Sequence, residues 1–104
     1  MSLRRREELV QVAREYDACI ITDDVYDLLQ WPAKKDGTHL PLEHARLPRV
    51  VDVDRSLDGG VEREGADGFG NAVSNGSFSK IAGPGCRTGW AEGTKKFAWG
   101  LSQV

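Results

Sequence analysis

The sequence predicts one small α/β domain built around a mostly parallel sheet. Three observations support this fold class: an amphipathic helical segment at residues 3–16, a continuous apolar run directly after it, and two further strand candidates between residues 71 and 93. A helix followed by a buried strand is half of the βαβ unit from which parallel sheets are built. The 104 residues are enough for one domain with one modest core.

The first element is predicted to be a helix over residues 3–16. Ser2 stands at its start, where a side-chain oxygen can cap the first free backbone N–H groups. Its apolar side chains recur at helical spacing and are Leu9, Val12, Ala13 and Tyr16.

The first predicted strand is Cys19-Ile20-Ile21-Thr22. Continuous hydrophobicity without alternation is typical of a strand covered on both faces. Asp23 and Asp24 follow directly. They therefore lie at the carboxyl end of the strand, where open α/β sheets usually bind their ligands.

The middle of the chain, residues 31–70, is rich in proline, glycine and acidic residues. We expect a long surface loop here, variable at about residues 32–68. Within it, Arg49–Asp54 is predicted to be a short strand. On such a strand Asp52 and Asp54 alternate with apolar residues, so they are expected to form its exposed face.

The last third of the chain returns to regular structure. Residues 71–78 and 87–93 are predicted to be strands, separated by the glycine-rich turn Gly83-Pro84-Gly85. From residue 94 to residue 104 apolar side chains recur at three- and four-residue spacing, which favours the start of a helix.

Composition excludes several functional classes. The formal net charge of −2 provides no field that would recruit nucleic acid or an anionic membrane. No apolar run approaches the roughly 20 residues that span a bilayer. Cys19 and Cys86 form no Cys-x-x-Cys pair and are too few for a disulfide scaffold. We therefore expect an intracellular, cytoplasmic protein.

Two segments carry a pattern with chemical meaning: residues 20–26, Ile-Ile-Thr-Asp-Asp-Val-Tyr, and residues 77–90, Ser-Phe-Ser-Lys-Ile-Ala-Gly-Pro-Gly-Cys-Arg-Thr-Gly-Trp. In this order they resemble the fold type I class I/II aminotransferases, which depend on pyridoxal 5′-phosphate. The similarity is greatest to the aminoadipate and aromatic branch with its fungal relatives. It implies that residues 1–104 are a fragment of the cofactor-binding large domain, a three-layer α/β/α sandwich.

The resemblance assigns Lys80 as the Schiff-base lysine that holds the cofactor aldehyde. A primary amine is the group that condenses with an aldehyde, and burial beside cationic Arg87 would favour its neutral form. Asp23 would face the pyridine nitrogen and keep it protonated. Tyr26, three residues on, would donate a hydrogen bond to the phenolic oxygen, while Asp24 is expected to make a local hydrogen bond.

Phosphate binding needs hydrogen-bond donors and positive charge. Ser77 and Ser79 offer hydroxyls, and the planar guanidinium of Arg87 matches phosphate oxygens. Gly83 and Gly85 permit close backbone approach. The predicted cofactor-binding residues are therefore Asp23, Tyr26, Ser77, Ser79, Lys80 and Arg87.

The implied function is transfer of an amino group from an amino acid to a 2-oxo acid, in a protein whose full-length relatives form homodimers. The chain corresponds only to a central slice of the family, so we expect it to be incomplete as an enzyme. Two alternatives stay open: a noncatalytic, truncated remnant, and the aminotransferase-like domain of a transcription regulator. Related lyases and decarboxylases share the fold and the lysine.

Other candidates are weaker. His39 and His44 lie five residues apart without a convincing third ligand, so no metal site is predicted. Cys86 is expected to pack in the glycine turn rather than to react. Trp31 and Trp90 are expected to be core or cleft-wall residues.

Overall fold

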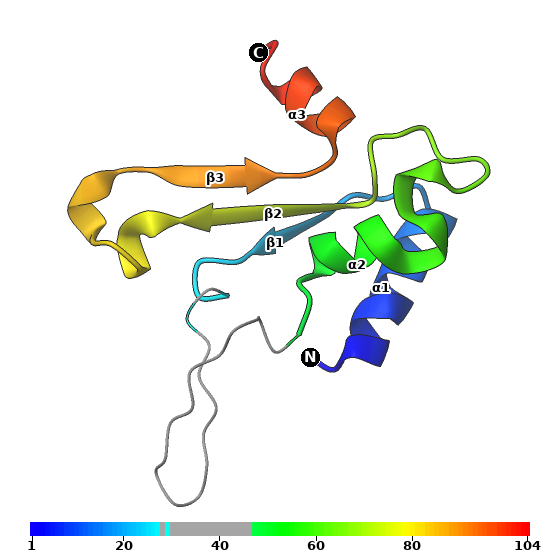
Figure 1. Cartoon of the computed structure of the whole chain (residues 1–104), viewed down its shortest axis with the longest axis horizontal. Helices are drawn as coiled ribbons and strands as arrows, with labels where there is room; N and C mark the ends of the chain where they lie inside the picture. The colour runs from blue at the N-terminus through cyan, green and yellow to red at the C-terminus, as the bar shows by residue number, and fades with distance from the viewer. Residues whose placement is uncertain (28, 30–46) are drawn as a thin grey trace, which may run out of the picture.

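The computed structural model describes residues 1–27, 29 and 47–104. The α-helices and strands of this part of the chain, labelled in Figure 1, follow in the order α1 (Leu3–Glu15), β1 (Ile20–Asp23), α2 (Val50–Ser56), β2 (Ala72–Ser77), β3 (Gly89–Glu92) and α3 (Lys95–Leu101). Short 3-10 helices connect them: η1 (Leu57–Glu62), η2 (Phe78–Lys80) and η3 (Pro84–Cys86).

The three strands form one mixed sheet in the order β1-β2-β3. β1 and β2 are parallel, with Ile20 opposite Ala72, whereas β2 and β3 are antiparallel, with Ser77 opposite Gly89. The α/β class is therefore confirmed, but the prediction of a mostly parallel sheet is wrong for the described residues. The short connection between β2 and β3 is the reason, because a parallel pair needs a longer crossover.

Helix α1 begins as predicted, since the Ser2 hydroxyl accepts a hydrogen bond from the Arg5 N–H at 3.3 Å. Its buried face differs from the predicted one: Val10 and Ala13 are buried, whereas Val12 and Tyr16 are exposed. The face is set by α2, which packs against α1 and covers one side of it.

Strand β1 is confirmed within one residue, but it is not covered on both faces. Ile20 packs against the core, whereas the Ile21 side chain, on the other face, is 72% exposed. Within the described part of the chain, the core therefore covers one face of this strand.

The predicted strand at Arg49–Asp54 is wrong, because these residues enter helix α2. The Asp52 carboxylate accepts a hydrogen bond from the Arg49 backbone N–H at 2.9 Å and so satisfies a free donor at the helix start. Val50 and Val53 lie on one helical face and are buried. Packing of that face outweighs the strand preference of β-branched side chains.

Asp54 is likewise buried, contrary to the prediction of an exposed face. Its side chain is 2% exposed and forms an ion pair with Arg14 at 3.0 Å. Its second oxygen accepts hydrogen bonds from the backbone N–H groups of Asn71, at 2.6 Å, and Ala72, at 3.1 Å. One carboxylate thus ties α1 and α2 to the start of β2.

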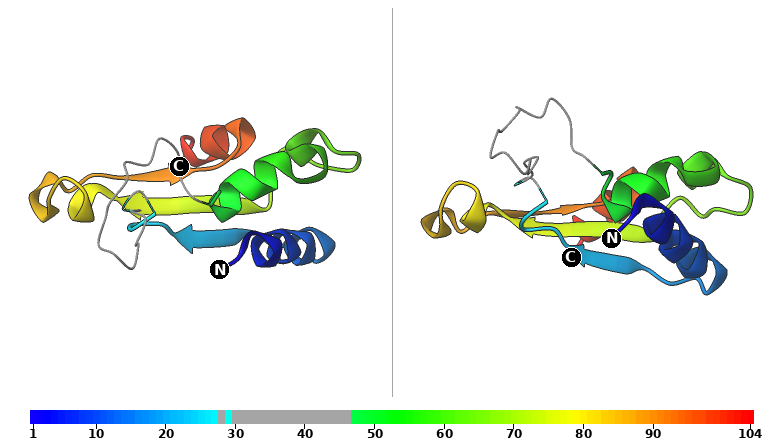
Figure 2. Two further views of the ribbon diagram at one scale, coloured as in Figure 1. Left: turned by 60° about the horizontal axis from the view of Figure 1, so that its bottom comes forward. Right: turned by 90° about the horizontal axis from the view of Figure 1, so that it is seen from below.

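The core lies where α1, α2 and the first residues of β1 and β2 meet. It consists of Val10, Val50, Val51, Val53 and Ala72, with Ile20 and Leu57 packed against it. Both views of Figure 2 show α1 and α2 at one end of the sheet and the connection between β2 and β3 at the other. No helix in the described residues is long and apolar enough to cross a membrane.

The predictions for the last third of the chain are confirmed. β2, β3 and α3 lie within the expected segments, and the Thr94 hydroxyl caps α3 by accepting from the Phe97 N–H at 3.1 Å. The predicted variable loop at about residues 32–68 holds helix α2 and η1 in its described part. Its residues 32–46, with His39 and His44, lie outside the described residues, as does Trp31.

Candidate functional site

The candidate site lies where the parallel strands β1 and β2 end. Asp23 is opposite Asn75 in the parallel ladder, so both strands finish at the same edge of the sheet. In Figure 1 the arrows of β1 and β2 point the same way, toward the connection between β2 and β3. The two sequence motifs, residues 20–26 and 77–90, are far apart in the chain but both run through this end of the sheet.

Asp23 and Asp24 differ sharply in their surroundings. Asp24 is buried, and its carboxylate accepts a hydrogen bond from the Thr22 hydroxyl at 2.6 Å, which is the local bond expected of it. Its backbone N–H also extends the β1–β2 ladder by donating to the Asn75 carbonyl at 2.7 Å. Asp23 is exposed at the end of β1. The geometry thus leaves Asp23, and not Asp24, available to a ligand.

Tyr26 and Asp27 lie in the turn that follows β1. The Tyr26 side chain is 61% exposed. Partial burial, and then the nearby carboxylate of Asp24, raise the pKa of Asp27, although the guanidinium groups of Arg6 and Arg49 act in the opposite direction. The charged form of Asp27 is disfavoured for these reasons.

Lys80 is the last residue of η2, directly after β2. The Ser77 hydroxyl accepts from the Ser79 backbone N–H at 3.1 Å and lies 2.8 Å from the Ser79 hydroxyl. The Phe78 carbonyl accepts from the N–H groups of residues 81, 82 and 83 at 2.8–3.2 Å. These bonds turn the chain sharply after β2 and place Lys80 on the outside of the turn.

Arg87 lies at the far end of the same connection, residues 78–88. The backbone of Arg87 is left-handed, with φ 47° and ψ 36°, and η2 and η3 contact each other. A hydrogen bond from the Phe78 N–H to the Thr88 carbonyl at 3.0 Å closes the base of the connection. Lys80 and Arg87 are therefore held on one short loop, and Arg87 precedes β3 instead of beginning it.

Both cations are exposed, so the burial that would favour the neutral amine of Lys80 is not provided by this loop. Cys86 is exposed as well, and the prediction that it packs in the glycine turn is wrong. The reason is that the connection extends beyond the core, which lies at the other end of the sheet.

The predicted side chains fit pyridoxal phosphate as a donor set. Among the described residues, Asp23, Tyr26, Lys80 and Arg87 form no side-chain hydrogen bond or ion pair. A free amine, a free guanidinium, a free carboxylate and a phenol are thus available beside two serine hydroxyls. Aldehyde, phosphate, ring nitrogen and phenolic oxygen are the groups of the cofactor that such side chains can bind.

A charged network connects the start and the end of α2 to β3, and no spacing pattern in the sequence predicts it. Arg49 binds Asp52 at 3.0 Å and Glu92 at 2.7 Å, and Arg55 also binds Glu92 at 2.7 Å. The hydrogen bond from Arg49 lowers the pKa of Glu92, against the effect of partial burial, and Arg55 assists. The network joins α2 to β3 across 37 or more positions of the chain.

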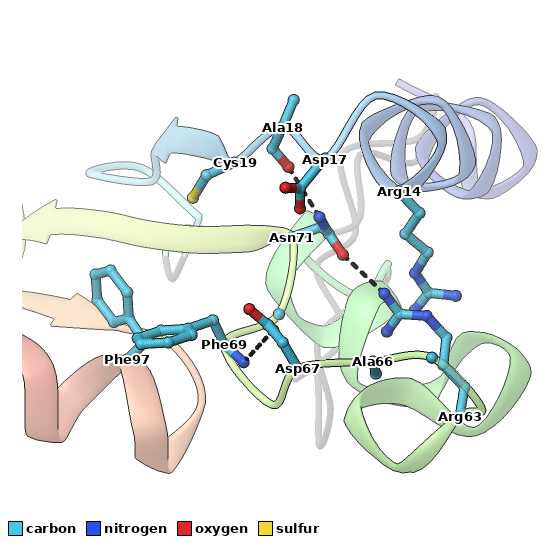
Figure 3. A pocket seen from close by; sticks show the side chains of 12 residues that line it. Arg14, Asp17, Ala18, Cys19, Arg63, Ala66, Asp67, Phe69, Asn71 and Phe97 are labelled. Carbon is cyan, nitrogen blue, oxygen red and sulfur yellow. Dashed lines mark hydrogen bonds between the residues drawn. The ribbon is translucent and has the colours of Figure 1, made fainter.

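A pocket among the described residues lies away from these side chains. It holds about 700 Å³ and lies at the opposite end of the sheet, beside α1 and the loop before β2 (Figure 3). Arg14 and Arg63 line it, but both guanidinium groups are already bound, Arg14 to Asp54 and Arg63 to Asn71 at 2.9 Å. We favour the strand ends as the site, because the free polar groups lie there.

Several known proteins that are similar to this chain are named as aminotransferases, the class that the two motifs indicate. The chain is 45% identical over 91 residues to an uncharacterized protein of Saccharomyces cerevisiae, which covers 88% of this chain. It is 35% identical over 99 residues, 94% of this chain, to an L-tyrosine:2-oxoglutarate aminotransferase of Tapinella panuoides. It is 28% identical over its whole length to an aromatic amino acid aminotransferase of Schizosaccharomyces pombe.

The matched region is 18%, 18% and 21% of these three proteins, so the chain spans about a fifth of their length. No family model and no solved structure matches the chain. Over nearly all of its length the chain is thus similar to a segment of aminotransferases.

Proposed function

We propose that this chain is the central, cofactor-binding segment of a pyridoxal-phosphate-dependent aminotransferase of fold type I. The observation that supports the proposal is that the two motifs lie at the ends of neighbouring parallel strands, where the side chains of four polar residues have no partner among the described residues: Asp23, Tyr26, Lys80 and Arg87. The relatives named as tyrosine and aromatic aminotransferases support it. Within a complete protein the described sheet would be part of a three-layer sandwich in a homodimer, in the cytoplasm.

Each side chain has a role in the proposal. Lys80 holds the cofactor by its aldehyde and, once released, moves a proton between the α-carbon of the substrate and the adjoining cofactor carbon. Asp23 accepts a hydrogen bond from the protonated ring nitrogen. Tyr26 donates to the phenolic oxygen. When bound, the cofactor supplies a cationic ring that accepts the electron pair released at the α-carbon.

The phosphate group would be held by Ser77, Ser79 and Arg87. The Ser77 hydroxyl donates to the Ser79 hydroxyl at 2.8 Å, which leaves the Ser79 hydrogen free to donate to a phosphate oxygen; Ser77 would donate to the phosphate by turning its hydroxyl away from Ser79. Arg87 adds a charged, planar pair of donors from the other end of the same loop.

The proposed reaction moves an amino group from an aromatic amino acid to a 2-oxo acid. The amino acid becomes a 2-oxo acid and the acceptor becomes an amino acid, without net oxidation. The aromatic preference comes from the relatives' names and is part of the proposal.

Cofactor binding tests the proposal. Titration of the protein with pyridoxal phosphate, followed by absorption, should give saturable binding that is at least about tenfold weaker in Lys80→Ala, because that change removes the amine proposed to bond to the aldehyde. Lys95→Ala, in α3, is the matched control and should bind as the wild type does. Equal binding by all three proteins would contradict the proposal.

A second titration tests the phosphate role. The wild-type protein should bind pyridoxal phosphate about tenfold or more tightly than pyridoxal, which lacks the phosphate. Arg87→Ala should lose most of this preference. A preference that persists unchanged in Arg87→Ala would place the phosphate elsewhere.

Amino-group transfer separates this function from a second candidate, a segment that binds the cofactor without catalysis, which the exposure of Lys80 favours. The protein loaded with pyridoxal phosphate is given L-tyrosine and 2-oxoglutarate, and glutamate is measured. Glutamate formed by the wild type and not by Lys80→Ala supports the aminotransferase. Binding without transfer supports the second candidate.

A further inference from the structure

Trp90, in the middle of β3, covers a glycine on the neighbouring strand. Trp90 is opposite Gly76 in the antiparallel ladder of β2 and β3. A Cβ atom added to Gly76 would lie only 2.1 Å from Cζ2 of the indole ring. The ring therefore occupies the space above Gly76, and it can do so because Gly76 has no side chain.

The same ring contacts the start of the loop that carries Lys80. Phe78 packs edge-on against Trp90, with ring centroids 5.3 Å apart and planes at 67°. The indole N–H donates to the buried Ser74 hydroxyl at 3.4 Å. The Trp90 ring is thus held against β2 by its hydrogen bond to Ser74, and it contacts Phe78 directly after the strand ends.

Phe78 in turn determines the path of the loop. Its N–H closes the loop base by donating to Thr88, and its carbonyl accepts the N–H groups of residues 81–83. Lys80 is two residues after Phe78, and Arg87 is one residue before Thr88. No residue between 78 and 88 is buried, so the loop has no core of its own to order it.

We propose that Trp90 is a positioning residue, which orders the loop of residues 78–88 through Phe78 and so sets Lys80 and Arg87 for cofactor binding. The role toward the cofactor depends on the function proposed above. The ordering of the loop does not, and it can be measured without any cofactor.

Hydrogen exchange measures the ordering. In Trp90→Ala the amides of residues 81–83 should exchange about tenfold faster than in the wild type, because the aromatic contact that holds their acceptor is lost. Amides of α1 should keep their protection. Trp99→Ala is the matched control, since Trp99 lies on α3 and is 68% exposed. It should leave residues 81–83 unchanged.

Two further variants keep the test informative if Trp90→Ala folds poorly. Trp90→Phe retains a ring beside Phe78 and should restore most of the protection and of the pyridoxal phosphate affinity. Gly76→Ala keeps the tryptophan at position 90 but pushes its ring away from β2, because the added methyl group needs the space that the ring occupies. The amides of residues 81–83 should then exchange faster, as in Trp90→Ala. If Trp90→Ala weakened pyridoxal phosphate binding only by destabilising the whole fold, an aromatic ring at position 90 would have no special effect. Recovery of the affinity in Trp90→Phe therefore indicates the ring contact with Phe78.

The outcomes separate the two proposals. Faster exchange at residues 81–83, with affinity for pyridoxal phosphate reduced about tenfold, supports the positioning role. Faster exchange in a protein whose wild type does not bind the cofactor supports loop ordering by Trp90 and overturns the proposed function instead. Unchanged exchange at residues 81–83, or equal loss of protection in α1, would overturn the role of Trp90.

Discussion

The two ends of the sheet are stabilised by different kinds of interaction. At the end where β1 and β2 begin, apolar side chains are buried between α1, α2 and the sheet, and a buried carboxylate binds an arginine and two backbone N–H groups. At the end where these strands stop, Ser77 and Ser79 are half-buried and the other candidate site residues are exposed, and the hydrogen bonds are local to the loop. Stability and the proposed chemistry are therefore located apart.

This separation has a physical reason. A group that binds a ligand must keep free donors, acceptors or charge, and such groups are costly to bury without partners. At the core end Asp54 is fully satisfied, whereas at the site end Lys80 and Arg87 have no partner among the described residues. Substitutions at the core end should thus lower stability, whereas substitutions at the site end should weaken cofactor binding.

The largest effect on stability is expected at Asp54. Asp54→Ala removes the buried carboxylate that pairs with Arg14 and leaves the N–H groups of Asn71 and Ala72 without their acceptor, so the free energy of unfolding should fall by roughly 3–5 kcal/mol. Urea denaturation followed by circular dichroism measures it. Asp58→Ala is the control, because Asp58 pairs with the same arginine at 3.7 Å but is 67% exposed. Equal effects of the two changes would contradict the account.

A smaller effect is expected at Val51 in the core. Val51→Ala removes two buried methyl groups and should lower the free energy of unfolding by about 2 kcal/mol. Val12→Ala on α1, where the side chain is half exposed, should have a much smaller effect. The same urea series provides the comparison, and a loss at Val12 as large as at Val51 would mean that the core is wrongly placed.

The charged network predicts a dependence of stability on pH. Arg49 holds the pKa of Glu92 below its usual value of 4.5 in the folded chain. The stabilising contribution is therefore present above that value and is lost as the pH falls through the lower folded pKa. Glu92→Gln should be less stable than the wild type at pH 7 and should show a flatter decline below pH 4.5.

Urea midpoints at a series of pH values between neutrality and strong acid measure the decline. The matched control is Glu62→Gln at the end of η1, an exposed carboxylate that should retain the wild-type slope. If Glu92→Gln also retained the full wild-type slope, the network would have no part in acid sensitivity.

The smallest effect on stability is expected at Lys80. Its side chain is exposed and unpaired, so Lys80→Ala should leave the urea midpoint unchanged while it weakens cofactor binding. Asp54→Ala should lower the urea midpoint strongly and Lys80→Ala should not, so this pair of variants compares the two ends of the sheet most directly. A large drop in the midpoint of Lys80→Ala would show that this loop supports the fold.

Much of this arrangement could be predicted from the sequence, where local signals agree with the packing. The cap at Ser2 and the strands predicted at residues 19–22 and 71–78 each carry a local signal that the tertiary structure reinforces, and the observed strands lie within one residue of these bounds. The run of valines at residues 50–53 was misleading, because strand propensity favours one state and contact with α1 selects the other.

The role of Asp54 and the contact of Trp90 with Gly76 could not be predicted in the same way. Both depend on partners that are 14 to 40 positions away, and no spacing rule links such positions. A charged residue flanked by Val53 and Arg55 gives no sign that an arginine of α1 binds it. The candidate site residues remain a prediction from motifs, which the fold brings to one end of the sheet.

The most direct test of the central claim is to find which lysine binds the cofactor. One equivalent of pyridoxal phosphate is added, the mixture is reduced with borohydride, and peptides are weighed to locate the adduct among the five lysines. If Lys80 is the Schiff-base lysine, the adduct is concentrated on Lys80. An adduct spread evenly over Lys34, Lys35, Lys80, Lys95 and Lys96 would contradict it.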